Sequence, residues 1–210
     1  MTRHDITIPL GVGVPEWPGD TPYSCRWTWE IARGASVNVS EITSSPHVGT
    51  HADAPLHVSA GWPAAHEIPL EPFIGRAFVW TVSSEATTIQ PDDLRRLPIP
   101  PGGVERLLLR TGRSIAAGTF PDSWPALSVA AVRVLLERGL RLLGVDAPSV
   151  DLRASTELEV HHALFQGGAY NLENLDLREV GDGEYDLLAL PLKIVDADAA
   201  PTRALLVSRD

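Results

Sequence analysis

The stretch "SVAAVRVLLERG" at residues 128–139 decides the fold class, because it predicts an α-helix that connects two β-strands. Ser128 can cap the start of this helix, apolar residues recur at steps of three and four, and Gly139 stands where the helix is expected to end. The run "VERLLLRT" at 104–111 precedes it and "LRLLGVDA" at 140–147 follows directly. A strand, a helix and a strand in this order predict a βαβ unit with parallel strands.

Short β-rich runs dominate the rest of the chain, and turn residues separate them. Further strands are predicted at residues 5–10, 25–31, 36–44, 75–82 and 185–195, with antiparallel pairing in the first half. Short helices are predicted over 91–97 and within 156–165, the second ending at Gly167. Residues 95–103, rich in Pro and Gly, are expected to form a surface connection. The sequence therefore predicts a mixed α/β fold in a single domain over residues 1–210.

The composition argues against nucleic-acid-binding and membrane proteins. The 210 residues are 44% hydrophobic and carry a formal net charge of −10, so a phosphate backbone is not an expected partner. The longest apolar runs fall far short of the roughly 20 residues of a membrane-spanning helix, and the N-terminal residues lack the apolar stretch of a signal peptide. Cys25 is the only cysteine, which excludes intrachain disulfides and favours a reducing compartment. We expect a cytoplasmic protein.

The segment "HVGTHADAPLH" at residues 47–57 contains three histidines and one aspartate. His47, His51, Asp53 and His57 follow one another at offsets of four, two and four residues, so in an extended chain all four side chains would project to one side. A straight strand, however, would place the first and the last of them roughly 33 Å apart, too far to share one ion. The segment must therefore bend if its side chains act together.

Two bends are predicted within this segment. Gly49 can adopt a positive φ between the first two histidines, and Pro55 after Ala54 supplies a second corner. Imidazole and carboxylate ligands without thiolate suit Zn²⁺, with Mn²⁺ or Fe²⁺ as substitutes. The segment therefore predicts a metal site. The alternatives are ordinary surface or core histidines, or a structural zinc, which needs only four ligands.

A later segment supplies further ligand candidates at His161, His162 and Glu173. Adjacent residues on a helix point about 100° apart, so only one of the two histidines is expected to face the first cluster, and spacing does not choose between them. The acids Glu157 and Glu159 are expected to be solvated charges.

Polar residues also follow the predicted strand over 140–147. Asp146, Ser149 and Asp151 are expected either to orient metal ligands or only to cap and turn the chain. No Gly-x-Ser-x-Gly sequence is present, so the nucleophile of a serine hydrolase lacks its usual context.

These motifs resemble those of the metal-dependent cyclase-like hydrolases. The segment "SPHVGTHADAPLH" is similar to the signature of that family, and further similar segments follow the family's order along nearly the whole chain. They are "VPEWPGDTPY" (14–23), "LLGVDAPSVD" (142–151), "HHALF" (161–165), "NLENL" (171–175) and "LLALPLKIVDADAAPTRALL" (187–206).

The resemblance implies a three-layer β/β/α fold, a homodimer and a pair of Zn²⁺ ions, or other divalent ions such as Mn²⁺. The ligands that it implies, with both carboxylates bridging, are His47, His51, Asp53, His161 and Glu173. His57 is then left free for proton transfer, and Trp17 matches an aromatic residue that lines the substrate pocket.

The members that the chain resembles most hydrolyse N-formyl-L-kynurenine to L-kynurenine and formate in tryptophan breakdown, and this small molecule is the expected substrate. One alternative is a hydrolase or cyclase of the same family that acts on a cyclic amide, a lactone or a polyketide. From a different class, a non-catalytic metal-binding protein would have a closed metal site and no turnover.

Overall fold

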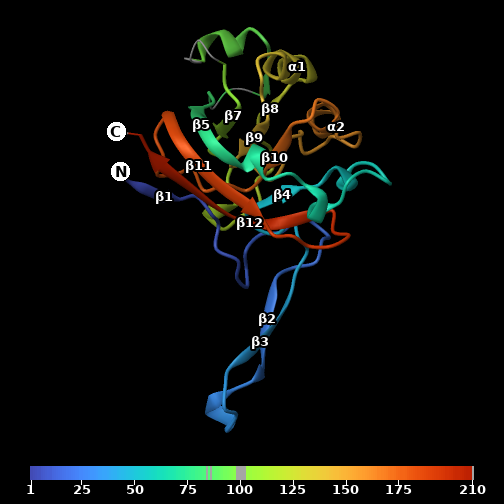
Figure 1. Cartoon of the computed structure of the whole chain (residues 1–210), viewed down its shortest axis with the longest axis vertical. Coiled ribbons are helices and arrows are strands. Elements are labelled where there is room, and N and C mark those ends of the chain that lie inside the picture. Colours follow the sequence, from blue (N-terminus) through green and yellow to red (C-terminus); the bar gives the residue numbers. More distant parts are fainter. Residues whose placement is uncertain (84, 86, 98–102, 210) are drawn as a thin grey trace.

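The computed structural model describes residues 1–83, 85, 87–97 and 103–209 (Figure 1). Its strands are β1 (Arg3–Asp5), β2 (Ser24–Trp29), β3 (Val39–Thr43), β4 (His51–Asp53), β5 (Ile74–Thr81), β6 (Thr88–Ile89), β7 (Arg106–Arg110), β8 (Ala126–Leu127), β9 (Leu142–Val145), β10 (Tyr170–Leu172), β11 (Gly183–Pro191) and β12 (Ala199–Ser208). Its helices are α1 (Val129–Glu137) and α2 (Glu159–Gln166). The 3₁₀ turns are η1 (Ile31–Arg33), η2 (Pro55–His57), η3 (Ala65–Glu67), η4 (Glu71–Phe73), η5 (Asp93–Arg96) and η6 (Ile115–Ala117). Most of the predicted connection over 95–103 lies outside the described residues.

The main sheet is mixed, and its order in the described chain is β1-β12-β11-β5-β7-β9-β10, with β4 also paired to β12. The neighbours β5, β7, β9 and β10 run parallel to one another. The pairs β5/β11, β11/β12, β12/β1 and β12/β4 are antiparallel. The antiparallel strands of the first half therefore find most of their partners near the C-terminus.

Core residues cover both faces of the parallel strands. In β7, Leu107 and Leu109 pack in a core with α1 and α2, whereas Leu108 faces the opposite core with Leu187 of β11 and Leu206 of β12. The sheet curls so that β11 and β12 form a layer of their own (Figure 1). The predicted α/β class and the three-layer β/β/α arrangement are confirmed, and burial on both faces explains the unbroken run of leucines.

The predicted βαβ unit is present, with β7 and β9 parallel and Leu107 opposite Leu143. The Ser128 side chain accepts a hydrogen bond from the backbone N–H of Ala131 at 3.2 Å, and Gly139 follows the helix with a φ of +90°. The helix α2 ends before Gly167, as predicted. Within the described part of the chain, no helix is long and apolar enough to cross a membrane.

The predicted helix over 91–97 is only the 3₁₀ turn η5, because so few residues between two prolines cannot offset the cost of starting an α-helix. The predicted strands also do not include β12, the longest of those described. Pro201 lies within it, and proline is normally excluded from the middle of a paired strand. Its buried residues nevertheless alternate, as in a half-buried strand.

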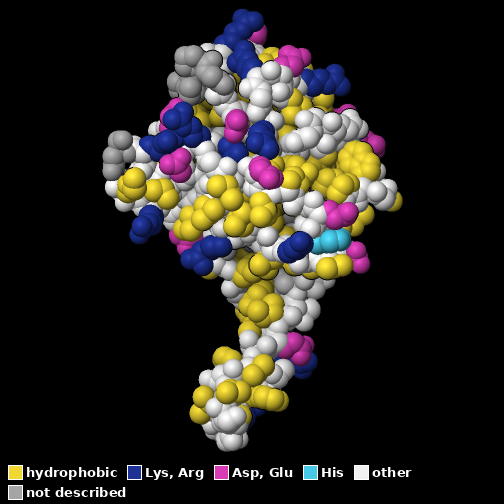
Figure 2. Space-filling model, in the orientation of Figure 1, with side chains coloured by type: hydrophobic (Ala, Val, Ile, Leu, Met, Phe, Trp, Pro, Cys, Tyr) yellow, Lys and Arg dark blue, Asp and Glu magenta, His cyan; other side chains and the backbone are white. Residues whose placement is uncertain are grey.

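The strands β2 and β3 form an antiparallel hairpin, with Cys25 opposite Ile42. This hairpin arm projects away from the body of the molecule (Figures 1 and 2). Every residue of both strands is exposed, including Trp27 and Trp29. The arm therefore has β-sheet hydrogen bonds but no hydrophobic core of its own.

Candidate metal centre and active site

Both predicted bends of the histidine segment are present. Gly49 has a φ of +70°, and a Cβ atom there would lie 2.6 Å from Leu10 Cδ2, so both the backbone and the space require glycine. Beyond Asp53, the turn η2 begins at Pro55 and ends at His57. The segment thus folds back on itself, as the sequence requires for a shared site.

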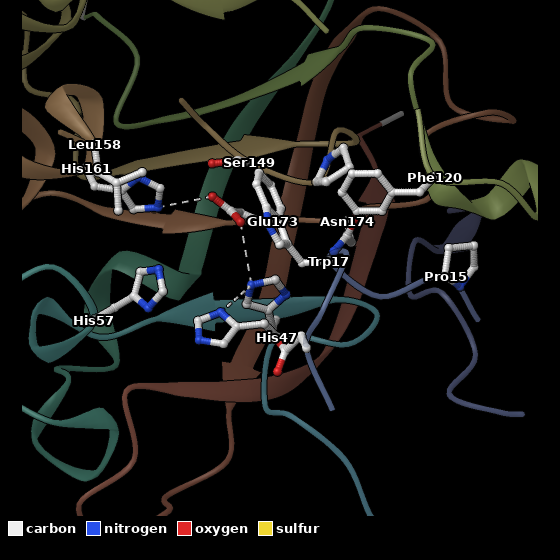
Figure 3. A pocket seen from close by; sticks show the side chains of 13 residues that line it. Pro15, Trp17, His47, His57, Phe120, Ser149, Leu158, His161, Glu173 and Asn174 are labelled. Carbon is white, nitrogen blue, oxygen red and sulfur yellow. Dashed lines mark hydrogen bonds and ion pairs between the residues drawn. The ribbon is translucent and has the colours of Figure 1, made fainter. Parts of the chain in front are cut away.

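The structure brings together the five side chains of the implied ligand set, which we call the ligand cluster: His47, His51, Asp53, His161 and Glu173 (Figure 3 labels His47, His161 and Glu173). Asp53 Oδ1 is 3.0 Å from His47 Nδ1 and 3.3 Å from His51 Nε2. Asp53 Oδ2 is 3.1 Å from His161 Nε2. Glu173 Oε1 is 3.2 Å from His161 Nε2, and its Oε2 is 3.6 Å from His51 Nε2. The two carboxylates therefore each contact histidines from distant parts of the chain.

The ligand cluster fits a divalent cation. Two groups of side chains each offer ligand atoms within 4.8 Å of one another, one formed by His47, Asp53 and His57 and the other by His51, Asp53 and Glu173. Asp53 belongs to both groups, and its buried Oδ1 accepts no hydrogen bond among the described residues. A divalent cation is stabilised where a buried carboxylate oxygen and imidazole nitrogens can bind it together. His57, for which the resemblance implies proton transfer, also lies within reach of such an ion.

In the ligand cluster, attraction between opposite charges shifts the pKa values further than burial does. Burial lowers the pKa of His51, but attraction to Asp53 and Glu173 raises it overall to about 10. Burial acts in the same way on His47, but its contacts with Asp198 and Asp53 raise its pKa to about 9. Conversely, burial raises the pKa of Asp53, yet the neighbouring imidazoles hold it well below its usual value. In the metal-free protein, the histidines of the cluster therefore hold protons that must leave before these side chains can bind a metal.

The helix α2 settles which of the two adjacent histidines faces the cluster. His161 is buried against Asp53, whereas the ring of His162 packs edge-on against Trp62 at 5.7 Å. Asp151 fixes this orientation, because its Oδ2 accepts hydrogen bonds from His161 Nδ1 at 2.7 Å and from the His161 backbone N–H at 3.1 Å. Its Oδ1 accepts from the Val160 N–H at 3.0 Å. Asp151 therefore both orients the imidazole and caps the helix, the two roles that the sequence left open.

Asp146 and Ser149, for which the sequence left two roles open, hydrogen bond to backbone N–H groups near the cluster. Asp146 accepts hydrogen bonds from the N–H groups of Thr111 and Gly112, so it shapes the loop after β7. The Ser149 hydroxyl accepts one from the Asp151 N–H at 3.1 Å. Glu157 and Glu159 are exposed, as predicted.

Asn171 and Asp198 are neighbours of the cluster that the sequence analysis did not identify. Asn171 Nδ2 donates to Asp53 Oδ2 at 2.6 Å and to Glu173 Oε1 at 3.2 Å. Its position two residues before Glu173, on one face of an extended segment, was a usable signal. Asp198 Oδ2 lies near His47 Nε2 and His57 Nδ1, and no local spacing indicates that contact.

A cavity of about 300 Å³ opens above the cluster (Figure 3). His47, His51, His57, His161 and Glu173 line its polar side. Its apolar side is lined by Pro15, Trp17, Phe120, Pro148 and Leu158. Trp17 packs edge-on against Phe120 at 5.4 Å between ring centroids and stays 41% exposed, so part of its ring is available to a ligand. The arrangement places an apolar wall beside a candidate metal centre.

Comparison with known proteins places the chain among metal-dependent hydrolases. Residues 4–152 match the family named Cyclase, described as "Putative cyclase". The chain is 43% identical over 204 residues to kynurenine formamidase of Bordetella petrii, covering 96% of each chain. It is 42% identical over 202 residues to kynurenine formamidase of Bacillus thuringiensis (strain Al Hakam), covering 96% of this chain and 95% of the relative. A solved structure described as a potential metal-dependent hydrolase with cyclase activity has a TM-score of 0.83 at 30% identity, over 100% of this chain and 98% of the other.

Proposed function

The chain belongs to the Cyclase family, and from that premise we propose that it is a metal-dependent hydrolase that converts N-formyl-L-kynurenine to L-kynurenine and formate. The observation that carries this proposal is the ligand cluster beside an aromatic wall, in a chain about 42% identical to kynurenine formamidases over nearly its full length. A hydrolytic centre and a surface for an aryl ring are what this substrate requires.

We assign the ligand cluster as the metal site, with two Zn²⁺ ions or two similar divalent ions per chain. Asp53 and Glu173 would hold the ions together with His47, His51 and His161, since each carboxylate contacts two or more of these histidines. Such a metal pair, when bound, would lower the pKa of a water molecule and polarise a carbonyl oxygen. Asp151 holds His161 with its Nε2 toward the cluster, as a metal-binding imidazole requires.

We assign His57 as the group that moves protons. It lines the cavity, and its ring centroid is 4.4 Å from that of His47 and 5.8 Å from that of His161. In the reaction, a water oxygen bonds to the formyl carbon and the C=O π pair moves onto the formyl oxygen, while His57 takes a proton from that water. The C=O bond then re-forms as the C–N bond breaks, and His57 returns the proton to the departing arylamine nitrogen, so that formate and the free amine are released. Imidazole suits both steps because one of its ring nitrogens can accept a proton and then donate it.

We assign Trp17 to substrate binding. Its half-exposed ring and that of Phe120 form the aromatic wall of the cavity, and an aryl ring packs well against such edges and faces. We further propose that residues 1–210 form one catalytic domain, in a homodimer in the cytoplasm. The exposed apolar side chains of the hairpin arm support association, because surfaces of this kind mark protein contacts.

A metal-reconstitution assay tests the proposed function. The purified protein is stripped with a chelator, reloaded with Zn²⁺ or Mn²⁺, and supplied with N-formyl-L-kynurenine while formate is measured. We expect formate release only after reloading, with about two ions per chain by elemental analysis. A matched panel contains a cyclic amide, a lactone and an aryl acetamide. Turnover confined to one of these would reject the substrate, and bound metal without any turnover would indicate a non-catalytic metal-binding protein.

A further inference from the structure

One carboxylate oxygen joins the ligand cluster to the proposed proton-transfer residue. Asp198 Oδ2 lies 3.0 Å from His47 Nε2 and 3.3 Å from His57 Nδ1, so both imidazoles can donate an N–H to the same atom. Among the described residues, no other side chain hydrogen bonds to the His57 ring. The contact links a proposed metal ligand and a proposed base through a residue outside both roles.

Backbone pairing fixes the position of this carboxylate. Asp198 directly precedes β12, whose first residue, Ala199, lies opposite Asp53 of β4. The Asp198 carbonyl accepts a hydrogen bond from the Ala54 N–H at 2.8 Å, and the Ala197 carbonyl accepts one from the Ala65 N–H at 2.8 Å. These bonds tie the start of β12 to Ala54, directly before the turn η2 that carries His57, and to the first residue of the turn η3. The carboxylate is therefore held beside His57 by the sheet rather than by a flexible side chain alone.

The contact with Asp198 favours one of the two neutral tautomers of the His57 imidazole. A neutral histidine carries its proton on either ring nitrogen, and the nitrogen that donates to a carboxylate keeps the proton. Because Asp198 contacts His57 at Nδ1, the lone pair is left on Nε2. In the other form, Nδ1 would present its lone pair to a carboxylate, which is unfavourable. A base needs that free lone pair on the nitrogen that takes the proton.

We propose that Asp198 is a positioning residue that holds His57 in the Nδ1-protonated form, with Nε2 available to the reacting water. This inference rests on the proposed role of His57 in amide hydrolysis. The competing explanation is that Asp198 only pairs with His47 and supports the ligand cluster, since it contacts both rings. The two explanations differ in whether the effect of Asp198 passes through His57.

A double-mutant cycle separates them. Asp198→Ala is measured alone and combined with His57→Ala, with the metal content determined for each variant. We expect Asp198→Ala to lower kcat by about 10- to 100-fold, as for other residues that orient a site histidine, with KM within about twofold. In the His57→Ala background it should cause no further loss, because residues that act as a unit are not additive. An equal loss in both backgrounds, or loss of metal in Asp198→Ala, would overturn the proposal.

Conservative variants in the same loop provide the control. Asp198→Asn keeps one oxygen that can accept from His57, so we expect it to recover part of the activity lost in Asp198→Ala. Asp196→Asn changes the exposed carboxylate two residues earlier, and asparagine tolerates its positive φ of 58°. That variant should retain wild-type kcat and KM. A defect in Asp196→Asn as large as that in Asp198→Asn would point to general loop damage and reject the specific role.

A second readout does not depend on turnover. In the zinc-loaded protein labelled with ¹⁵N-histidine, NMR distinguishes protonated from unprotonated ring nitrogens, and His57→Gln identifies the signals of this residue. We expect Nδ1 of His57 to be protonated in the wild type and the two forms to mix in Asp198→Ala. An unchanged His57 spectrum would refute the proposal. If the wild type shows the expected form but does not release formate, the proposed function fails while the positioning role stands.

Discussion

The ligand cluster and the hairpin arm depart from ordinary protein architecture in opposite ways. In the cluster, polar groups are buried, with His51 and Asp53 each only 1% exposed. In the arm, large apolar groups face solvent, with Trp27 at 56% and Ile42 at 61%. The arm is followed in the chain by the histidine segment, which supplies three of the five residues of the cluster, because β3 ends at Thr43.

This contrast shows that residue type does not set exposure here. A buried polar group is stable only where partners satisfy it. Asp198 before β12 contacts His47, whereas His161 of α2 and Asn171 of β10 contact Asp53. The arm pairs only with itself, so its apolar side chains have nothing within the described chain to pack against. Buried polar clusters and exposed apolar surfaces are the two departures most often tied to function. Here they correspond to proposed chemistry and proposed association.

Removing the central carboxylate of the cluster should have the largest effect. We expect Asp53→Ala to lose bound metal and all measurable turnover, because both groups of ligand atoms share this residue. It should also lower the free energy of unfolding by about 3–5 kcal/mol, since buried imidazolium groups lose their partner. Elemental analysis and denaturant titration measure both. Asp92→Ala, at an exposed carboxylate, is the control. Full metal content in Asp53→Ala would contradict the assignment.

Removing the imidazole of His57, the proposed base, should lower activity but leave the metal content unchanged. We expect His57→Ala to keep its metal and to lower kcat by about 10²- to 10⁴-fold, the usual contribution of a general base. Steady-state kinetics with elemental analysis check this result, and His162→Ala, at the histidine that faces away from the cluster, is the matched control. A fully active His57→Ala enzyme would remove this residue from the mechanism. Loss of metal would make His57 a ligand instead, consistent with its place in one of the two groups.

The protons in the cluster should make stability depend on pH in opposite directions with and without metal. The pKa values of His47 and His51, about 9 and about 10, exceed the ordinary value of 6.5. Their pairing therefore stabilises metal-free protein fully below about pH 6.5, and this contribution is lost as the pH rises through 9 to 10. Zn²⁺ must displace these protons, so its stabilisation should grow over the same range. Thermal unfolding at several pH values, with and without Zn²⁺, tests both; parallel curves would contradict the prediction.

Changing the aromatic wall should affect substrate binding more than chemistry. We expect Trp17→Ala to raise KM by about two- to tenfold while kcat changes little, because an aromatic contact contributes about 0.5–1.5 kcal/mol. The same substitution should have less effect on a small formamide without an aryl ring. An equal loss with both substrates would show that Trp17 supports the fold of the pocket through Phe120 and Trp124 rather than the ligand.

Changes in the arm should have the smallest effect on the fold of one chain. We expect Trp27→Ser with Trp29→Ser to change the free energy of unfolding of the body by no more than about 0.5 kcal/mol, because both rings are exposed. If the arm joins two chains, sedimentation equilibrium should show a dimer for the wild type and a monomer for this variant. A wild type that stays monomeric at all concentrations would refute the proposed homodimer.

Local patterns in the sequence were sufficient for several features of the fold and of the site. The helix α1, the parallel pair β7 and β9, and both bends of the histidine segment depend on residues close together in the chain. Periodicity, a capping serine and glycines at required turns encode such features within short windows. The histidines and the aspartate within residues 47–57 also indicated a metal site, because so many imidazole and carboxylate groups are uncommon in so short a segment.

Contacts between distant segments required the folded chain. The pattern around His161 and His162 could not tell which ring faces Asp53, whereas the capping bonds of Asp151 to α2 decide it. Pro201 argues against a strand at this position, so β12 was not predicted from the sequence. The placement of Asp198 beside His57, which depends on β12, was therefore not predicted either. The exposure of the arm likewise follows from the absence of a packing partner in the described chain, not from its own residues. Short-range preferences act on neighbours along the backbone, but burial and side-chain pairing depend on which remote segments the sheet brings into register.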